Sequence, residues 1–167
     1  MKTGLVEVLT LIDDMDERLH VPVPLEEFKD TLEEREKFVA EMLETMYTHR
    51  AVGLAANQVG IMRRMFVMDV SRRSLVCFNP IVNPISSDSV LLSEGCLSFP
   101  NIYLKIKRPS GIELKYQSIT GSEENIVLDG WPSRCAQHET DHLNGVVFTD
   151  LVSKLRLQMA KKKSMKV

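Results

Sequence analysis

The sequence has little of what marks a membrane protein or a secreted, disulfide-bonded protein. Its N-terminus lacks both the apolar segment of a signal peptide and the arginine- and serine-rich, acid-poor character of a transit peptide. Its three cysteines are an odd number and do not suit a disulfide framework, which indicates a reducing compartment. We therefore expect a cytosolic protein.

A strong excess of one charge is also lacking. The net charge is only −2, which argues against a general nucleic-acid-binding role. The 167 residues, 44% hydrophobic and 26% charged, have an ordinary globular composition and suit a single domain, residues 1–167, with one sizeable core. We expect a monomer with no membrane association.

The most informative stretch of the chain contains the pattern H-E-x-x-H. Residues four apart lie on one face of a helix, so His138 and His142 can bind one cation while Glu139 reaches a water molecule beside it. A lone histidine pair on an amphipathic helix is also often without any ligand. A catalytic metal site needs a third protein ligand and an open position, so another part of the chain must supply a donor.

Few metal donors follow this motif. No glutamate comes after Glu139 and no histidine after His142. Asp141 is better placed to accept a hydrogen bond from an imidazole N–H than to bind the metal itself. We therefore expect the third ligand to come from an upstream segment.

Of the three cysteines, Cys96 is the best candidate for that ligand. Cys135 shares a helical stripe with the histidines, but seven residues, about 10.5 Å of helix rise, separate it from His142, whereas metal–ligand bonds are about 2.0–2.3 Å long. Cys135 and Cys77 are expected to lie in the core. Cys96 follows Gly95 in an irregular strand end, from which a loop can present a thiolate. Taken alone, a buried structural cysteine is the simpler interpretation of Cys96.

Three motifs taken together resemble the signature motifs of peptide deformylases. Their order and separations also match, and the resemblance extends from about Leu11 to about Leu155. The motifs are Gly53-Leu54-Ala55-Ala56-Asn57-Gln58, Glu94-Gly95-Cys96-Leu97-Ser98 and Gln137-His138-Glu139-Thr140-Asp141-His142. The resemblance implies an enzyme that acts on nascent formyl-methionyl polypeptides, removing the N-terminal formyl group and releasing formate.

The resemblance also implies a ligand set and a metal. Cys96, His138 and His142 match the family's ligands of one divalent ion, which is usually Fe²⁺ in the cell and can be replaced by Zn²⁺, Ni²⁺ or Co²⁺. Such a mixed set of one thiolate and two imidazoles suits all four ions, so the sequence does not choose among them.

Catalytic groups follow from the same match. Glu139 matches the family's general base and acid, a positioned proton transfer typically worth about 10²–10⁴-fold in rate. Gln58 and the backbone N–H of Leu97 match its oxyanion-binding pair. Gln58 could also be an ordinary surface or turn glutamine, but the small residues before it favour close approach of a substrate.

The substrate groove is expected around the first two motifs. Val52, Gly53, Glu94 and Gly95 are the predicted substrate-binding residues. Val52, Trp131 and Arg134 are candidates for the side-chain pocket that the sequence cannot position. Three positions depart from the family pattern, namely Ala51 and Asn101, where glycine is common, and Asn57, where proline is frequent. These departures concern the groove and leave the proposed ligands and Glu139 untouched.

Glu94 and Arg108 are predicted to form an ion pair that braces the Cys96 loop. The alternative is two independent surface charges, because exposed ion pairs are common and weak.

The remaining pattern predicts the secondary structure. Apolar residues at helical spacing among acidic and basic ones predict an amphipathic helix from Leu25 to Thr48. Pro132 suits the first turn of the H-E-x-x-H helix. Short strands are predicted at Arg64–Val70, Leu75–Val82, Val90–Ser93, Ile102–Lys107 and Gly111–Ser118, with turns at Asn79-Pro80, Asn83-Pro84, Arg108–Gly111 and Thr120–Ser122. The expected fold is α+β, with short antiparallel β-sheets packed around that central helix, an N-terminal amphipathic helix and a C-terminal helix.

The C-terminal tail, about 154–167, is basic and contains three consecutive lysines, Lys161 to Lys163. Such a tail is most often a solvated helix end or a frayed terminus. Because the substrate implied by the resemblance emerges from ribosomes, a contact of this tail with ribosomal RNA is a further hypothesis.

Two other functions are compatible with the same residues. A metallo-amidase or peptidase could act on a different small N-acyl or peptide substrate, and a structural or sensory protein could keep the metal as a staple. A closed structural site has no need of a carboxylate such as Glu139 beside an open coordination position, which favours an enzyme.

Overall fold

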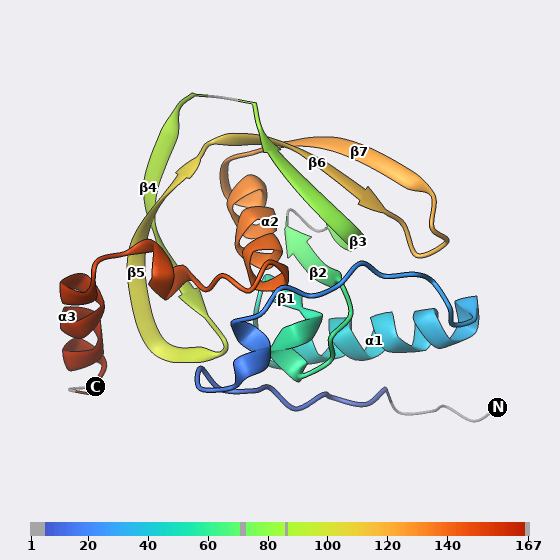
Figure 1. The fold of residues 1–167 in the computed structure, drawn as a ribbon, viewed down its shortest axis with the longest axis horizontal. Helices are drawn as coiled ribbons and strands as arrows, with labels where there is room; N and C mark the ends of the chain where they lie inside the picture. The colour runs from blue at the N-terminus through green and yellow to red at the C-terminus, as the bar shows by residue number, and fades with distance from the viewer. Residues whose placement is uncertain (1–5, 71–72, 86, 166–167) are drawn as a thin grey trace.

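The computed structural model describes residues 6–70, 73–85 and 87–165 and has an α+β fold (Figure 1). One antiparallel sheet has the strand order β1-β2-β3-β6-β7, and β4 and β5 form a separate antiparallel ribbon. The strands are β1 (Gly53–Ala55), β2 (Met65–Val70), β3 (Arg73–Pro84), β4 (Ser89–Cys96), β5 (Phe99–Pro109), β6 (Gly111–Gln117) and β7 (Glu123–Asp129). The helices are α1 (Leu32–Thr48), α2 (Gly130–Leu143) and α3 (Lys154–Ser164), with short 3₁₀ turns η1 (Glu17–Leu19), η2 (Ala56–Val59) and η3 (Phe148–Leu151).

Helix α2 lies at the centre of the molecule, between the large sheet and the β4–β5 ribbon (Figure 1). Its buried face carries Ala136 and Leu143, which pack with Phe66 and Leu114 of the large sheet. Pro132 lies in its first turn, as expected, where a missing N–H leaves no helical hydrogen bond unmade. This placement holds the H-E-x-x-H residues on a rigid, buried element.

Helix α1 begins seven residues later than the sequence pattern predicts. Thr31 caps it, and Glu34 returns a hydrogen bond to the Thr31 backbone, forming a capping box. The segment before it is irregular, and Phe28 has a φ of +52°, which no helix accommodates. The ring of Phe28 packs 5.2 Å from that of Phe78, so its apolar character reflects core packing of a loop.

The two Asn-Pro pairs predicted as turns lie inside β3, so that prediction is wrong. Asn79 has a φ of +48°, and the register with β6 shifts between Phe78 and Ile81, which makes this a β-bulge. The Asn79 side-chain amide donates to the Gln117 side chain at 2.7 Å and to the Glu26 carbonyl at 3.0 Å. The bulge therefore accommodates the proline within a continuing strand.

The other predicted strands are present, but two further ones were missed. β1 is only three residues long, and β7 is an outer strand in which most residues are exposed. Neither carries an apolar alternation long enough to predict a strand: β1 is too short for one, although Leu54 and Ala55 are buried, and β7 exposes most of its side chains.

The remaining core lies under the ribbon and beside α1. α1 packs Met42 and Met46 against Leu54 and Phe78. Cys77 and Cys135 both lie in the core cluster that includes the buried face of α2, as expected.

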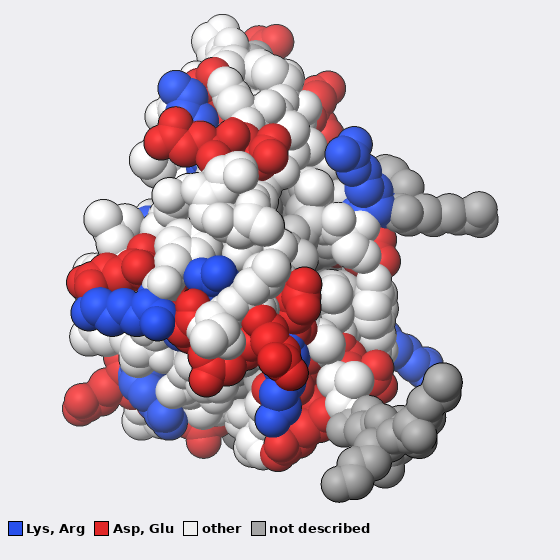
Figure 2. All heavy atoms as spheres, turned by 90° about the vertical axis from the view of Figure 1, so that its right-hand side faces the viewer, with Lys and Arg blue, Asp and Glu red and all other residues white. Residues whose placement is uncertain are grey.

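Acidic and basic side chains are interspersed on the face shown in Figure 2. In the described part of the chain, no helix is long and apolar enough to cross a membrane.

Candidate metal centre and active site

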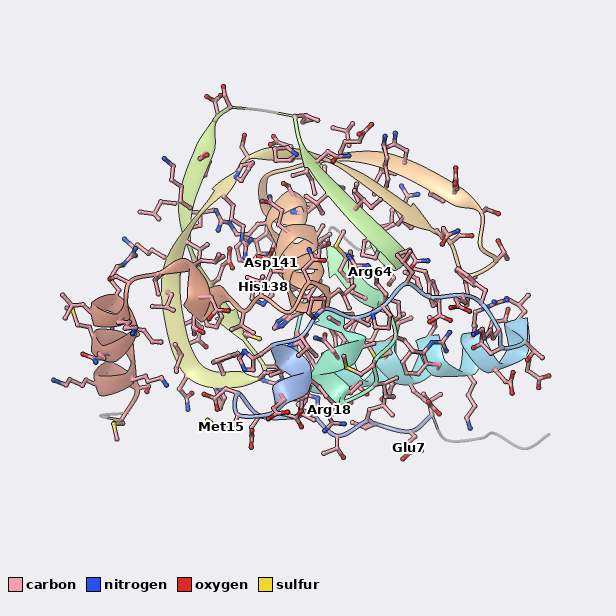
Figure 3. All side chains as sticks on the ribbon, viewed as in Figure 1. Glu7, Met15, Arg18, Arg64, His138 and Asp141 are labelled. Carbon is pink, nitrogen blue, oxygen red and sulfur yellow. The ribbon has the colours of Figure 1, made fainter. Side chains whose placement is uncertain are left out.

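Three predicted ligands from two distant segments meet beside α2. Cys96 ends β4, whereas His138 and His142 lie one turn apart on α2, and their ligand atoms all fall within 4.8 Å of one another. The Cys96 Sγ atom is 3.2 Å from Nε2 of His142. The two imidazoles pack edge to face with their centroids 4.9 Å apart. Figure 3 shows His138 and Asp141 on this helix.

This cluster fits a divalent transition metal. One thiolate and two imidazoles form a donor set that suits Fe²⁺, Co²⁺, Ni²⁺ or Zn²⁺. Nδ1 of His138 is engaged by Glu94, so its Nε2 is the nitrogen free for a metal. Cys135 is outside the cluster, in agreement with the argument from helix rise.

Glu94 is the hub of a buried charge network behind the metal cluster. Its two carboxylate oxygens accept from Nε and Nη2 of Arg108 at 2.6 and 3.0 Å, so the expected ion pair is present. Oε1 also accepts from Nη1 of Arg134 at 2.6 Å, and Oε2 lies 3.0 Å from Nδ1 of His138. Burial opposes ionisation of Glu94, but the hydrogen bonds and charges of His138 and Arg108 outweigh it and lower its pKa to about 2.

Asp141 does not have the role expected from the sequence. Its Oδ2 atom accepts from Nη1 of Arg108 at 2.7 Å, and the imidazole N–H of His138 is taken by Glu94. Helical spacing places Asp141 near the histidines, but it does not show that the Glu94 carboxylate of β4 accepts the hydrogen bond from His138. Asp141 therefore holds the outer end of Arg108.

Glu139 lies buried beside the cluster. Its Oε2 atom has no hydrogen-bond partner among the described residues. Burial raises its pKa to about 7, against the attraction of the positive charge of His138. A Cβ atom added to Gly53 would lie 2.5 Å from Oε1 of Glu139, so the absence of a side chain at Gly53 makes room for this carboxylate. A carboxyl group with such a pKa can both accept and release a proton near neutral pH.

Gln58 is buried and held in one orientation, which excludes the alternative of an ordinary surface glutamine. Its Oε1 atom accepts from the Ala55 N–H at 2.9 Å. Its Nε2 atom consequently faces Cys96 Sγ at 3.3 Å and Ser98 Oγ at 3.4 Å. The side-chain amide N–H groups of Gln58 are thus directed into the site.

A pocket of about 670 Å³ opens beside the cluster. The four predicted substrate-binding residues line it, together with Gln58, Leu97, His138 and Glu139. Trp131 and Arg134 line it as well, so that together with Val52 all three side-chain pocket candidates lie in this lining. The predicted substrate-binding residues are Val52, Gly53, Glu94 and Gly95.

The three departures from the family pattern have different consequences. Ala51 and Asn101 line the pocket, and Asn101 has a φ of +62°, a conformation that favours glycine and that asparagine tolerates. Asn57 is buried outside the pocket and donates from Nδ2 to the His142 carbonyl at 2.7 Å. Asn57 therefore joins η2 to α2. The expectation that this residue shapes the substrate groove is wrong.

Several contacts at the site were not predicted from the sequence. Arg134 joins the Glu94 network, Ser98 meets Gln58, and Tyr103, His49 and Arg50 line the pocket. Helical spacing could have suggested Arg134. It lies four residues before His138 and therefore on the same face of α2.

Comparison with known proteins agrees with this arrangement. A family model described as polypeptide deformylase matches residues 8–158. A peptide deformylase of Wolbachia pipientis wMel is 37% identical over 175 aligned positions, which cover 97% of each chain. One from Thermotoga petrophila is 42% identical over 144 positions, 86% of each chain. The crystal structure of a peptide deformylase from Synechococcus elongatus in complex with actinonin is similar with a TM-score of 0.88 and 38% identity, covering 99% of this chain and 91% of that one.

Proposed function

Since the chain belongs to the polypeptide deformylase family, whose members are metal-dependent enzymes that remove the N-formyl group from nascent polypeptides, we propose that its site hydrolyses formyl-methionine termini with Cys96, His138 and His142 as metal ligands. The convergence of these three donor groups is the observation that carries the proposal. In the cell the ion is proposed to be Fe²⁺. A divalent ion held there would polarise the formyl carbonyl and lower the pKa of a water molecule.

Glu139 is the proposed general base and acid. It takes a proton from the attacking water as the water oxygen bonds to the formyl carbon. It then delivers that proton to the amine nitrogen as the C–N bond breaks, so that formate and a free methionyl amine are released. Its burial beside the ligands and its Oε2 atom, which has no hydrogen-bond partner among the described residues, support both steps, because this oxygen can face a reacting water molecule.

Gln58 and Leu97 are the proposed donors to the oxyanion. The Nε2 amide of Gln58 is already aimed at the cluster by the bond from Ala55 to its Oε1 atom, and Leu97 directly follows the cysteine ligand and lines the pocket. Preorganised donors of this kind need no reorganisation as negative charge develops. Removal of one typically lowers kcat by about 10²–10³-fold.

The remaining pocket residues are proposed to hold the peptide. The missing side chains at Gly53 and Gly95 leave room for Glu139 and Tyr103, so that both main chains can line the pocket, and Val52 offers apolar surface at the rim. The carboxylate of Glu94 is already occupied by two arginines and a histidine. Glu94 is therefore a substrate-binding residue through its main chain only, and its side chain supports the histidine ligand.

The test is formate release from formyl-Met-Ala-Ser amide by the anaerobically prepared Fe²⁺ protein, with acetyl-Met-Ala-Ser amide as the matched control. We expect formate from the first peptide and no acetate from the second. Equal hydrolysis of both would indicate a broader N-acyl amidase. A protein that retains metal but hydrolyses neither would support a structural or sensory role.

A ribosomal partner is proposed for the C-terminal end. Helix α3 buries none of its residues fully and carries Lys161, Lys162 and Lys163 in its last turn. A basic segment of this kind can bind RNA phosphates in a salt-dependent manner. Cosedimentation with ribosomes should fall when the chain is truncated after Leu157, and unchanged cosedimentation would contradict the proposal.

A further inference from the structure

The mouth of the catalytic pocket carries an arginine, Arg50, that has no acidic partner among the described residues. Arg50 follows α1 in a tight turn, with a φ of +54°, its N–H bonded to the Tyr47 carbonyl at 2.9 Å, and its side chain exposed. The next N–H, that of Ala51, donates to the Met46 carbonyl at 3.0 Å, which fixes the turn against the helix. The backbone thus delivers the Arg50 side chain to the pocket lining.

Other charges in this pocket are neutralised or deeply buried. The carboxylate of Glu94 compensates the guanidinium of Arg134, and Glu139 lies buried at the metal cluster. In contrast, no carboxylate within the described ranges lies within 4 Å of the Arg50 guanidinium. The pocket lining therefore carries a guanidinium group, that of Arg50, that no carboxylate of the described residues neutralises at ion-pair distance.

The groups around Arg50 suit a peptide side chain with an apolar stem and a negative end. His49 lines the same rim, with its Nδ1 atom 2.9 Å from the Thr45 carbonyl. Val52, Tyr103 and Trp131 are exposed large side chains on the pocket lining and offer apolar surface to methylene groups. An acidic side chain can lie along this surface and reach the guanidinium.

We propose that Arg50 makes the enzyme favour nascent chains that carry Asp or Glu shortly after the formyl-methionine. The proposal rests on the deformylase function and adds a substrate preference that the metal cluster itself does not determine. Arg50 is a binding residue that acts on a substrate side chain and takes no part in bond breaking.

The expected preference is modest and sensitive to salt. An exposed ion pair is weak, so kcat/KM for a peptide with Glu should exceed that for the same peptide with Lys by about threefold to tenfold. Most of the difference should lie in KM, because the interaction is made equally in the bound substrate and in the transition state. It should shrink between about 0.05 and 1 M salt, since the screening length falls to about 3 Å at 1 M.

The test uses C-terminally amidated peptides, so that no terminal carboxylate reaches Arg50. Formyl-Met-Ala-Ala-Ala amide is compared with versions in which Glu, Gln or Lys replaces each alanine in turn. The metal-loaded wild type is assayed beside Arg50→Lys, Arg50→Gln and Arg50→Glu, with Lys162→Gln on α3 as a control that loses the same charge outside the pocket. The measured quantity is the Glu-to-Lys ratio of kcat/KM, which does not depend on the amount of active enzyme.

At the position that faces Arg50, we expect the ratio to be kept in Arg50→Lys and in the control, to approach one in Arg50→Gln and to invert in Arg50→Glu. Fluorescence of Trp131, the only tryptophan, gives a second readout through binding of the deformylated products. A wild-type ratio near one at all three positions, or a ratio unchanged in Arg50→Gln, would overturn the preference. Absence of formate from the uncharged peptides would overturn the deformylase function and the preference with it.

Discussion

Oε2 of Glu94 lies 3.0 Å from Nδ1 of His138, and both side chains are largely buried. A carboxylate in this position fixes the orientation of the ring and leaves Nε2 to a metal. The same carboxylate neutralises Arg108 and Arg134. One side chain thus links the metal cluster to the charges that hold the ribbon against α2.

Replacement of Glu94 by Gln should weaken both functions. It would leave the buried guanidinium of Arg134 without its carboxylate partner and that of Arg108 with Asp141 alone, which should lower the free energy of unfolding by about 3–5 kcal/mol. Metal affinity should fall by about 10–100-fold, as is typical when a partner of a metal-ligating histidine is lost. Urea unfolding and competition with a metal chelator measure the two effects. Asp141→Asn, which removes only the half-exposed outer partner of Arg108, is the control and should have a clearly smaller effect on both.

Glu139 should make the metal-free protein lose stability as the pH rises. Its pKa is about 7 when folded and about 4.5 when unfolded, so the folded state binds this proton more tightly. The stabilising contribution is complete below pH 4.5 and is lost as the pH rises through 7, a difference of roughly 3 kcal/mol. Metal-free Glu139→Gln, which cannot ionise, should therefore gain on the wild type between pH 4.5 and 7. The free energy of unfolding of both proteins is measured with urea at several pH values. A difference between them that stays constant from pH 4.5 to 7 would contradict the assignment.

Gly53→Ala should lower turnover with little change in fold. The added Cβ would lie 2.5 Å from Oε1 of Glu139 and 2.8 Å from Sγ of Cys135, both side-chain atoms that can move. We expect kcat to fall at least about tenfold, because displacement of a catalytic base from its productive position is costly. Cys135→Ala leaves the Glu139 carboxylate in place and is the control for a perturbed core. A kcat unchanged in Gly53→Ala would show that Glu139 tolerates displacement.

Gly145→Ala should destabilise the fold more than a comparable change at Gly121. Both glycines have positive φ, +72° and +85°, so alanine is strained at each by about 1 kcal/mol. At Gly145 the new Cβ would also lie 2.6 Å from the main-chain carbon of Val21, whereas open space surrounds Gly121. Thermal unfolding of the two variants should show a larger decrease in Tm for Gly145→Ala. Equal decreases in Tm would mean that the Val21 segment moves away from the new Cβ atom without loss of stability.

The sequence revealed the ligands more readily than their supports. Helical spacing alone brings His138 and His142 together, independently of the rest of the fold. Because no glutamate or histidine follows them, the third ligand had to come from upstream, and Cys96 is the residue that meets them. The hydrogen-bond partner of His138, in contrast, depends on how the ribbon packs against α2, which no local pattern encodes. Proximity along the helix therefore favoured Asp141, although Glu94 from β4 occupies the position.

The errors in secondary structure have a similar cause. The apolar Phe28 before α1 resembles the continuation of a helical stripe, but its ring packs on Phe78 from an irregular segment. The capping pattern of Thr31 and Glu34 was visible in the sequence and marks the true helix start. The bulge at Asn79 depends on a side-chain bond to Gln117 on another strand, and only the tertiary structure supplies it.

The most direct test of the central claim is formate release by Glu139→Gln protein whose metal content is measured in the same sample. Glu139 is not one of the three clustered donors, so the variant should bind metal in the same amount as the wild type. We predict that metal content is retained and that kcat for a formyl-Met peptide falls by at least about 10²-fold. Wild-type turnover in the metal-loaded variant would contradict the account.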